Sequence, residues 1–456
     1  MCLTPPDQPP GRNAATGGRR TESALHAEID ERARAVAADV VAWRHHVHEF
    51  PELSNRERNT AALIAGHLRS LGCDEVRTGI AGHGVVGVLR GAAIARDDGQ
   101  QRVVALRADT DALPIKEESG EPFASTVVDE SYPGGPVPVA HACGHDCHVA
   151  MLMGAASVLR GVRDHLPGTV LFVFQPAEEG PPLDEEGGAA AMERGGAIAD
   201  PVPTMVFGMH VGPMPVGWVG YGTGDFYAAS AVVKIVVRGV GAHASTPWRG
   251  ADPLPVAADI VSQLAQIYRQ LPAQKALTVS IGHLTTHGRH NVIGDTVELL
   301  GTVRCSLDAD MTRLQERVAR IAGHLAQAHG CTADTTFHQP VPAVHNAPEW
   351  VTAALPTIEA VVGHERILEV PPTLGYDDIS VFINRCGGLY VQLGCQEVLV
   401  VNGAVHAMPG GRGIAFNHNP KFYAADEALH VGVRLHAHVA ADHLSGILAP
   451  EPGASG

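Results

Sequence analysis

Apolar positions follow two different periods along this chain of 456 residues. Between Ala24 and His48 they recur at roughly helical spacing, which predicts a helix that Pro51 ends. Ser54-Asn55-Arg56-Glu57 matches a capping box and predicts the start of a second helix. Short apolar runs bounded by glycine and charged residues predict buried strands, and together with the helices they predict an α/β fold. The clearest runs are residues 85–89, 103–106, 169–174 and 206–211.

The central part of the chain has a different order of predicted elements. From about residue 228 to residue 341 the order is strand, helix, strand, strand, helix, strand, as in a ferredoxin-like α+β domain. The length of the chain also favours two domains. We therefore expect a discontinuous domain of residues 24–227 and 342–456, with residues 228–341 inserted into it. Residues 1–23 are rich in proline, glycine and polar side chains, which predicts a disordered tail.

Composition limits the partners that we expect. With 33 basic and 49 acidic residues the formal net charge is -16, which argues against nucleic acid and anionic membranes as partners. No apolar run approaches the ~18 residues that a transmembrane helix needs. The 8 cysteines form no framework of close pairs, which is typical of a reducing compartment. The sequence therefore predicts a cytoplasmic protein that acts on a small-molecule substrate.

The segment His141-Ala142-Cys143-Gly144-His145-Asp146-Cys147-His148 concentrates side chains that bind metals. It holds three imidazoles, two thiols and one carboxylate, directly before an apolar helical run. Thiolates and neutral imidazoles are good ligands for zinc, cobalt or manganese. A buried turn would explain any one of these side chains, but it would not explain their density. Cys143 and His145 are therefore the first pair of candidate ligands.

Further candidate ligands follow predicted strands. One strand runs directly into Glu178 and Glu179, a pair in which one carboxylate can bind a metal while the other acts as a general base. Another strand ends at His210, and His418 precedes a predicted helix near the end of the chain. In an open α/β sheet, ligands bind at the carboxyl ends of the strands. We therefore expect these side chains to meet at that edge.

The sequence lacks the motifs of several common enzyme classes. It contains no GxSxG, Walker or HExxH motif, which argues against the usual serine hydrolases, P-loop proteins and zincins. Residues 239–244 match GxGxxA weakly, but no helix is predicted to begin there, so we expect no dinucleotide site.

Seven motifs in order resemble the signatures of the dinuclear-metal amidohydrolases related to aminoacylase and carboxypeptidase G. The similarity runs from Trp43 to about Leu429 and is greatest to hippurate hydrolases, N-acetyl-amino-acid deacetylases and auxin-conjugate hydrolases. It implies a metallopeptidase-type catalytic domain with a mixed sheet between helices, and an inserted lid domain that often forms a dimer interface. The motifs are RADTDALP, HACGHDCH, FQPAEEG, FGMHVGP, GVGAHASTP, NVIGDTVELLGTVR and HNPKFYAADEAL.

The resemblance also implies roles for individual residues. Two divalent metal ions, manganese or zinc with cobalt or nickel as alternatives, would be held by one set of ligands, and Glu178 would be the general base. Asp111 would orient a ligand, and His243 would stabilise the oxyanion, in its own site or in that of a partner subunit. Asn291 and Arg304 would hold the substrate, and the chain would form a homodimer or a higher homo-oligomer. The implied ligands are Cys143, His145, Glu179, His210 and His418.

Departures from the family motifs fall on the substrate side. Gly294 stands where relatives usually have proline, and residues 376–379 and 220–227 read differently from the usual segments. The motifs of the ligands and the base are intact, so we expect metal-dependent hydrolysis of a C–N bond in an N-acyl amino acid or related amide. Hydrolytic deamination of an activated aromatic amine and dipeptide hydrolysis stay open as alternatives. A non-catalytic binding protein is disfavoured because neither the base nor any ligand is missing.

Overall fold

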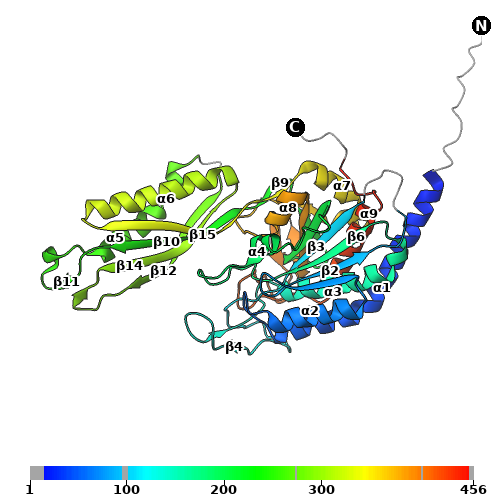
Figure 1. Ribbon diagram of the computed structural model, residues 1–456, viewed down its shortest axis with the longest axis horizontal. Coiled ribbons are helices and arrows are strands. Elements are labelled where there is room, and N and C mark those ends of the chain that lie inside the picture. Colours follow the sequence, from blue (N-terminus) through cyan, green and yellow to red (C-terminus); the bar gives the residue numbers. More distant parts are fainter. Residues whose placement is uncertain (1–14, 95–100, 273–274, 402–403, 451–456) are drawn as a thin grey trace, which may run out of the picture.

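The computed structural model describes residues 15–94, 101–272, 275–401 and 404–450 of the chain (Figure 1). These residues form two units along the long axis of the molecule, one built on an eight-stranded sheet and the other on a four-stranded sheet. The chain enters the smaller unit at β10 (Ala229–Arg238) and leaves it at β15 (Thr332–Val341). The smaller unit is therefore inserted into the larger one, and we call it the inserted domain.

The large sheet is mixed, as the family resemblance predicts. Strands β6, β3, β7 and β18 are parallel to one another, whereas β2 pairs antiparallel with β6, and β8 antiparallel with β18. The predicted fold class is thereby confirmed for this part of the chain. In spatial order the strands are β1 (Glu75–Ile80), β2 (Gly84–Arg90), β6 (Thr169–Gln175), β3 (Val103–Asp109), β7 (Met205–Pro215), β18 (Gly388–Gln396), β8 (Val219–Tyr221) and β17 (Ile367–Glu369).

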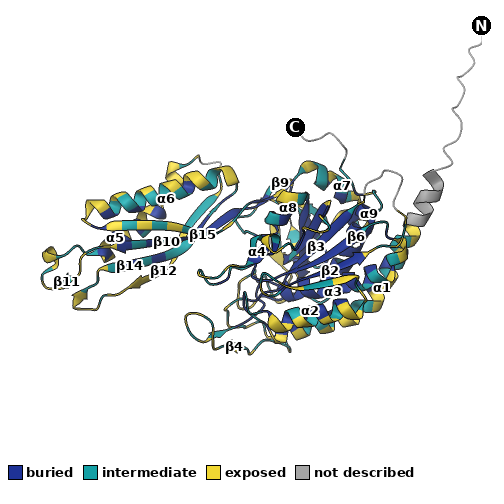
Figure 2. Cartoon of the chain, in the orientation of Figure 1, coloured by how far each residue is buried: buried dark blue, intermediate teal, exposed yellow. Residues whose placement is uncertain are grey.

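Helices cover both faces of the large sheet because its inner strands are apolar on both faces. On β3, Val104 and Leu106 pack into one hydrophobic core, and Val103 and Ala105 pack into another on the opposite face. The inner strands are accordingly buried along their length (Figure 2). The first core includes α1 (Ala15–Glu49), α2 (Arg58–Ser70), α3 (His145–Gly161), α7 (Pro348–Val362) and α9 (Glu427–Leu444), and the second includes α4 (Gly188–Arg194) and α8 (Ser380–Cys386).

Two local predictions at the N-terminal end are wrong. Helix α1 begins at Ala15, so residues 15–23 are helical, and residues 1–14 of the predicted tail lie outside the described residues. The capping box does not form, because α2 begins at Arg58 and the side chain of its N-cap residue makes no capping hydrogen bond. The carboxylate of Glu52 accepts the hydrogen bond of the Thr60 N–H at 2.9 Å instead. The predicted cap residue Ser54 is used elsewhere, in the candidate site.

The inserted domain has the predicted ferredoxin-like topology. Its sheet has the order β12-β14-β10-β15 with every neighbouring pair antiparallel. Alternate residues of β10 are buried against its two helices in a separate hydrophobic core. The outer faces of this domain are exposed (Figure 2). Besides β10 and β15 it contains α5 (Pro253–Leu264), β12 (Leu277–Thr286), β14 (Thr296–Cys305) and α6 (Asp308–Ala328).

Short elements complete the described part of the chain. Within it, no helix combines the length and the apolar composition that a membrane crossing needs. The short strands form four pairs, of which β9 and β16 lie beside the links to the inserted domain. The pairs are β4 (Val128–Asp129) with β5 (Val137–Pro138), β9 (Gly224–Tyr227) with β16 (Val344–Asn346), β11 (Ala242–His243) with β13 (Val292–Ile293), and β19 (Val398–Val401) with β20 (Ala404–Ala407).

Candidate metal centre

The fold brings the five predicted ligands and the predicted base together. Cys143 and His145 lie where α3 begins, and Glu178 and Glu179 follow the carboxyl end of β6. His418 comes from the loop before α9. The prediction that a strand ends at His210 is wrong, because β7 continues to Pro215 and presents His210 from its middle.

The donor atoms of these side chains lie within reach of shared metal ions. The ligand atoms of Cys143, His145 and His210 all lie within 4.8 Å of one another, and so do those of Cys143, Glu179 and His418. Cys143 Sγ is 3.4 Å from His210 Nε2, and His418 Nε2 is 3.0 Å from Glu179 Oε1. Because Cys143 belongs to both groups, the two groups are adjacent. This arrangement can hold two neighbouring cations.

The surroundings of the His145 side chain show whether these residues fit a divalent metal. Its Nδ1 donates to the backbone oxygen of Asp111 at 2.8 Å, which leaves Nε2 as the acceptor nitrogen. That Nε2 atom is buried and has no hydrogen-bond partner among the described residues. It lies 3.9 Å from a carboxylate oxygen of Glu178 and 3.9 Å from one of Glu179. A buried acceptor nitrogen facing carboxylates and a thiol fits a divalent metal, and a carboxyl group behind the imidazole is the usual support of such a ligand.

Asp111 ties several parts of the site together. Its Oδ1 lies 3.2 Å from His145 Nδ1, and its Oδ2 accepts hydrogen bonds from Ser54 Oγ at 2.7 Å and from the Glu179 N–H at 3.0 Å. The side chain is therefore positioned to orient His145 and the loop that carries Glu179. Ser54 was missed as part of the site because its spacing to Glu57 matches a capping motif.

Several residues at or beside the donors have positive φ angles. Gly144 has a φ of 92°, and a Cβ atom there would lie 2.3 Å from Val211 Cγ2, so only glycine fits between Cys143 and His145. Ala177, at φ 56°, precedes the two glutamates, and His418 itself has a φ of 67°. Non-glycine residues with positive φ angles have a strained backbone, and such residues cluster at functional sites.

The two adjacent glutamates have opposite electrostatic environments. Burial, together with the charges of Asp377 and Glu179, raises the pKa of Glu178 well above its usual value. Burial alone would also raise the pKa of Glu179, but the hydrogen bond and charge of His418 and the charge of His145 lower it to about 2. Two carboxyl groups whose pKa values are pushed apart can take different roles. Glu179 fits the role of an anionic ligand, and Glu178 fits that of a proton acceptor.

His148 supports the site without serving as a free donor. Its Nε2 accepts the hydrogen bond of the Val211 N–H at 2.9 Å, so its Nδ1 carries the proton and donates to Asp109 Oδ1 at 2.5 Å. Both ring nitrogens are therefore engaged, and the side chain fixes the backbone of β7 next to His210. The sequence places His148 in the metal-rich segment, but only the structure shows that its partners come from β3 and β7.

Arg107 holds the carboxyl groups behind Glu178. Its buried guanidinium donates to Asp109 at 2.6 Å, to Asp377 at 3.4 Å and to Asp378 at 3.0 Å. Tyr390 also donates its hydroxyl to Asp377. Burial raises the pKa of Asp378 to about 7 even beside Arg107. Sequence reasoning missed this cluster, although an arginine and an aspartate on an otherwise apolar strand were the available signal.

A second buried network holds the start of α3 against α1. Asp146 accepts hydrogen bonds from Arg44 Nε at 3.0 Å and from His48 Nδ1 at 2.9 Å. His48 Nε2 also lies 2.8 Å from Glu117. Burial alone would lower the pKa of His48, but these two carboxylates raise it to about 9. A histidine near the end of a helix can be read as a partner of the helix dipole, which is why its role beside the site was missed.

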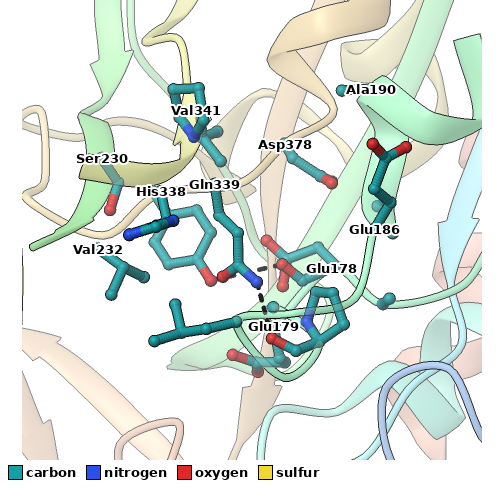
Figure 3. Close-up of a pocket in the computed structure, with 18 of the residues that line it drawn as sticks. Glu178, Glu179, Glu186, Ala190, Ser230, Val232, His338, Gln339, Val341 and Asp378 are labelled. Carbon is teal, nitrogen blue, oxygen red and sulfur yellow. Dashed lines mark hydrogen bonds between the residues drawn. The ribbon is translucent and has the colours of Figure 1, made fainter. Parts of the chain in front are cut away.

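Two cavities open onto the glutamates. One, of about 550 Å³, lies between β10 and β15 of the inserted domain and the loop after β6, and we call it the interdomain cavity (Figure 3). There Gln339 Nε2 donates to the backbone oxygen of Pro181 at 2.8 Å, which joins the inserted domain to the loop of Glu178 and Glu179. The other, of about 590 Å³, extends along β7 and β18, and we call it the apolar cavity.

The three predicted residues of the inserted domain separate into two places. Arg304 lines both cavities, donates from Nη1 to the backbone oxygen of Leu374 at 3.0 Å and lies over the ring of Tyr376. His243 lies on β11 and Asn291 directly precedes β13, and both residues are exposed where these paired strands lie, at the end of the inserted domain far from the large sheet (Figure 1). The structure therefore brings Arg304 to the site of its own chain, but not His243 or Asn291.

Known proteins resemble the chain over nearly its whole length. The family model described as Peptidase family M20/M25/M40 matches residues 105–442. The chain is 31% identical over 420 residues to the IAA-amino acid hydrolase ILR1-like 2 of Arabidopsis thaliana, which covers 90% of this chain and 87% of that protein. It is 31% identical over 414 residues to the N-acetylcysteine deacetylase of Bacillus subtilis, covering 89% and 97% of the two chains.

A solved structure extends the similarity to the fold. The Bacillus subtilis YXEP protein, described as a dinuclear metal binding peptidase from the M20 family, matches with a TM-score of 0.68 at 28% identity. The match covers 90% of this chain and 99% of that one. The region that the family model matches includes all the candidate ligands, from Cys143 to His418.

Proposed function

The chain belongs to peptidase family M20/M25/M40, a family of hydrolases acting on amide C–N bonds, and we propose that it hydrolyses N-acyl amino acids. The observation that carries the proposal is the pair of buried Glu178 and Glu179, whose side chain is only 6% exposed, next to Cys143, His145 and the other donors. Relatives named for acting on an auxin conjugate and on N-acetylcysteine support an acylated amino acid as the substrate class.

The residues of this chain can supply the proton transfers that amide hydrolysis needs. When bound, divalent metals supply a Lewis acid that polarises the amide carbonyl and lowers the pKa of water. Glu178 accepts the proton of the attacking water at its carboxylate and passes it to the leaving nitrogen. Asp111 keeps His145 oriented during this exchange through its contacts with Nδ1. Arg304, which lines both cavities, is placed to hold the carboxylate of the amino acid.

We expect manganese or zinc as the native metal, with cobalt or nickel as alternatives. One thiol together with imidazoles and a carboxylate is a mixed donor set, and several divalent ions bind such sets. Metal availability then decides among them, so the test of function uses more than one ion.

The proposal is tested with protein stripped of metal and reloaded with manganese or zinc. We expect the reloaded protein to release amino acid from N-acetyl, N-benzoyl or indole-acyl amino acids, and the stripped protein to be inactive. Dipeptides and substituted aromatic amines are assayed in parallel, the latter for released ammonia. Turnover of aromatic amines or dipeptides with none on any acyl amino acid would overturn the proposal in favour of the corresponding alternative.

We also propose that the chain works as a homodimer in which His243 reaches the site of the partner subunit. His243 and Asn291 are exposed and far from the site of their own chain (Figure 1). Strand β12 lies at the edge of its sheet, and an exposed edge strand can pair with another chain.

Mixing two inactive variants tests this arrangement. Glu178→Gln and His243→Ala are each expected to be inactive alone. After joint refolding we expect roughly a quarter of wild-type activity, because half of the dimers are mixed and each mixed dimer has one intact site. No recovery, with mixed dimers shown to be present, would contradict a shared site.

A further inference from the structure

The apolar cavity contains a polar pair that the proposed reaction does not use. Tyr227 and Gln392 line it together with Glu178, Glu179 and His210. Gln392 Nε2 donates to the Tyr227 hydroxyl at 3.1 Å. Tyr227 ends the segment 220–227, in which the sequence departs from the family motifs.

Both side chains are held firmly beside the candidate ligands. Gln392 on β18 is the register partner of His210 on the parallel strand β7, so the two side chains point to the same face of the sheet. The ring of Tyr227 packs edge-on against Phe226 at 5.0 Å and against Tyr390 at 5.3 Å between ring centres. Only 8% of Tyr227 is exposed. The pair is therefore a fixed feature of the cavity wall.

In either orientation of the Gln392 amide, the pair leaves at least one donor and one acceptor for a ligand. If the Gln392 amide donates to Tyr227, the tyrosine hydroxyl hydrogen and the amide oxygen remain available. If the amide is turned over, the tyrosine hydroxyl donates to it, and the amide N–H and the tyrosine oxygen remain available. Burial, with the charges of Asp377 and Cys143 nearby, raises the pKa of Tyr227 above its usual value, so the hydroxyl keeps its proton at neutral pH.

The rest of the cavity wall is mostly apolar or already engaged. Asn417 Nδ2 donates to the backbone oxygens of Cys143 and Val211, and Thr373 Oγ1 accepts the hydrogen bond of the Gly375 N–H. The volume of about 590 Å³ is ample for an aromatic ring and far exceeds an acetyl group. The apolar lining residues are Val211, Pro213, Met214, Val370, Pro371, Val405 and Phe416.

The two cavities differ in a way that orients the substrate. The interdomain cavity adds the polar side chains of His338 and Gln339 to Arg304, which lines both cavities, and it suits the amino-acid half with its carboxylate. The apolar cavity, on the other side of Glu178 and Glu179, suits the acyl half.

We propose that Tyr227 and Gln392 form a specificity subsite that recognises a ring hydroxyl or ring N–H on an otherwise apolar, aromatic acyl group of the substrate. This inference rests on the proposed function and adds the acyl class to it. A site built to bond one polar group discriminates strongly against an analogue that lacks the group, because its own buried partners are then left unpaired.

Matched pairs of substrates test the subsite in the metal-loaded protein. All carry alanine as the amino acid, and the acyl groups are benzoyl against 3- or 4-hydroxybenzoyl, and naphthylacetyl against indole-acetyl. For wild type we expect kcat/KM to be at least roughly ten-fold higher for one hydroxyl- or N–H-bearing member than for its match. In Tyr227→Phe we expect that ratio to fall to near one. Comparing the same substrates in two proteins cancels their different intrinsic reactivities.

Controls separate this inference from the proposed function. Tyr221→Phe removes a tyrosine hydroxyl outside both cavities and is expected to keep the wild-type ratio. A wild-type ratio near one for every pair would overturn the subsite, as would an equal loss on N-acetylalanine and on the hydroxyaryl substrates in Tyr227→Phe. Absence of turnover on every acyl amino acid would instead refute the proposed function itself.

Discussion

Replacing Glu178 by glutamine is expected to lower kcat by roughly 10² to 10⁴-fold while divalent metal stays bound. The amide keeps the size of the side chain but cannot accept a proton from water. Glu178 also lies in a candidate group with His145 and Glu179, but Cys143, His145 and His210 form one group without it and Cys143, Glu179 and His418 form another, so we expect metal to stay bound. The measurements are kcat on the best acyl amino acid and the metal content of the purified variant by elemental analysis.

Glu186→Gln is the matched control for this experiment. Glu186 also lines the interdomain cavity, but it is exposed and paired with Arg194 at 2.7 Å, so we expect kcat within about two-fold of wild type. Near wild-type turnover in Glu178→Gln would refute the assignment of the base. Loss of metal together with activity would instead make Glu178 a ligand.

The elements around the site were predictable because their signals are local. The strands β3 and β6 are buried, contain the apolar runs 103–106 and 170–174, and lead toward the acidic residues of the site. The segment that starts α3 carries its donors within a few positions, so their proximity needed no tertiary information. Glu178 and Glu179 are adjacent in the sequence, so their proximity could be predicted for the same reason.

The supporting contacts were not predictable because their partners are far apart in sequence. Arg107 and Asp377 are 270 positions apart, and His48 and Asp146 are 98 positions apart. Such pairs depend on how β3, the loop before α8 and the end of α1 come together, and no period within a single element encodes that. The capping-box prediction failed for a related reason, since Ser54 bonds to Asp111 rather than to its own helix.

The placement of His243 shows a different limit. The motif around it resembles the family signature, yet the pair of strands β11 and β13, in which it lies, is at the far end of the inserted domain (Figure 1). A motif assigns a side chain to a reaction, but it does not say which subunit's site that side chain completes. The mixing experiment proposed above supplies this information.

Replacing Arg107 by methionine is expected to destabilise the metal-free protein by about 3 to 5 kcal/mol, because it leaves buried carboxylates without their cation. Asp109, Asp377 and Asp378 all contact this guanidinium. The free energy of unfolding is measured by urea denaturation of metal-free wild type and variant. Arg238→Met is the control, since its ion pair with Asp334 on the inserted domain is exposed, and we expect a change of about 0.5 kcal/mol or less.

The loss of unfolding free energy in Arg107→Met, relative to wild type, is also expected to depend on pH. Arg107 lowers the pKa values of all three carboxyl groups, and burial already holds that of Asp378 at about 7 with Arg107 present. Burial already raises the folded-state pKa values of Asp377 and Asp378 above the unfolded value of about 3.9, and without the guanidinium they rise further, whereas His145 and His148 still lower that of Asp109. A carboxyl group with a raised folded-state pKa binds its proton more tightly in the folded protein, so stability falls as pH rises between the two values. The difference from wild type should therefore be larger at about pH 7.5 than at about pH 5.5. A deficit that is equal at both pH values, or greater at the lower one, would mean that Arg107 stabilises the protein by packing rather than by neutralising these carboxylates.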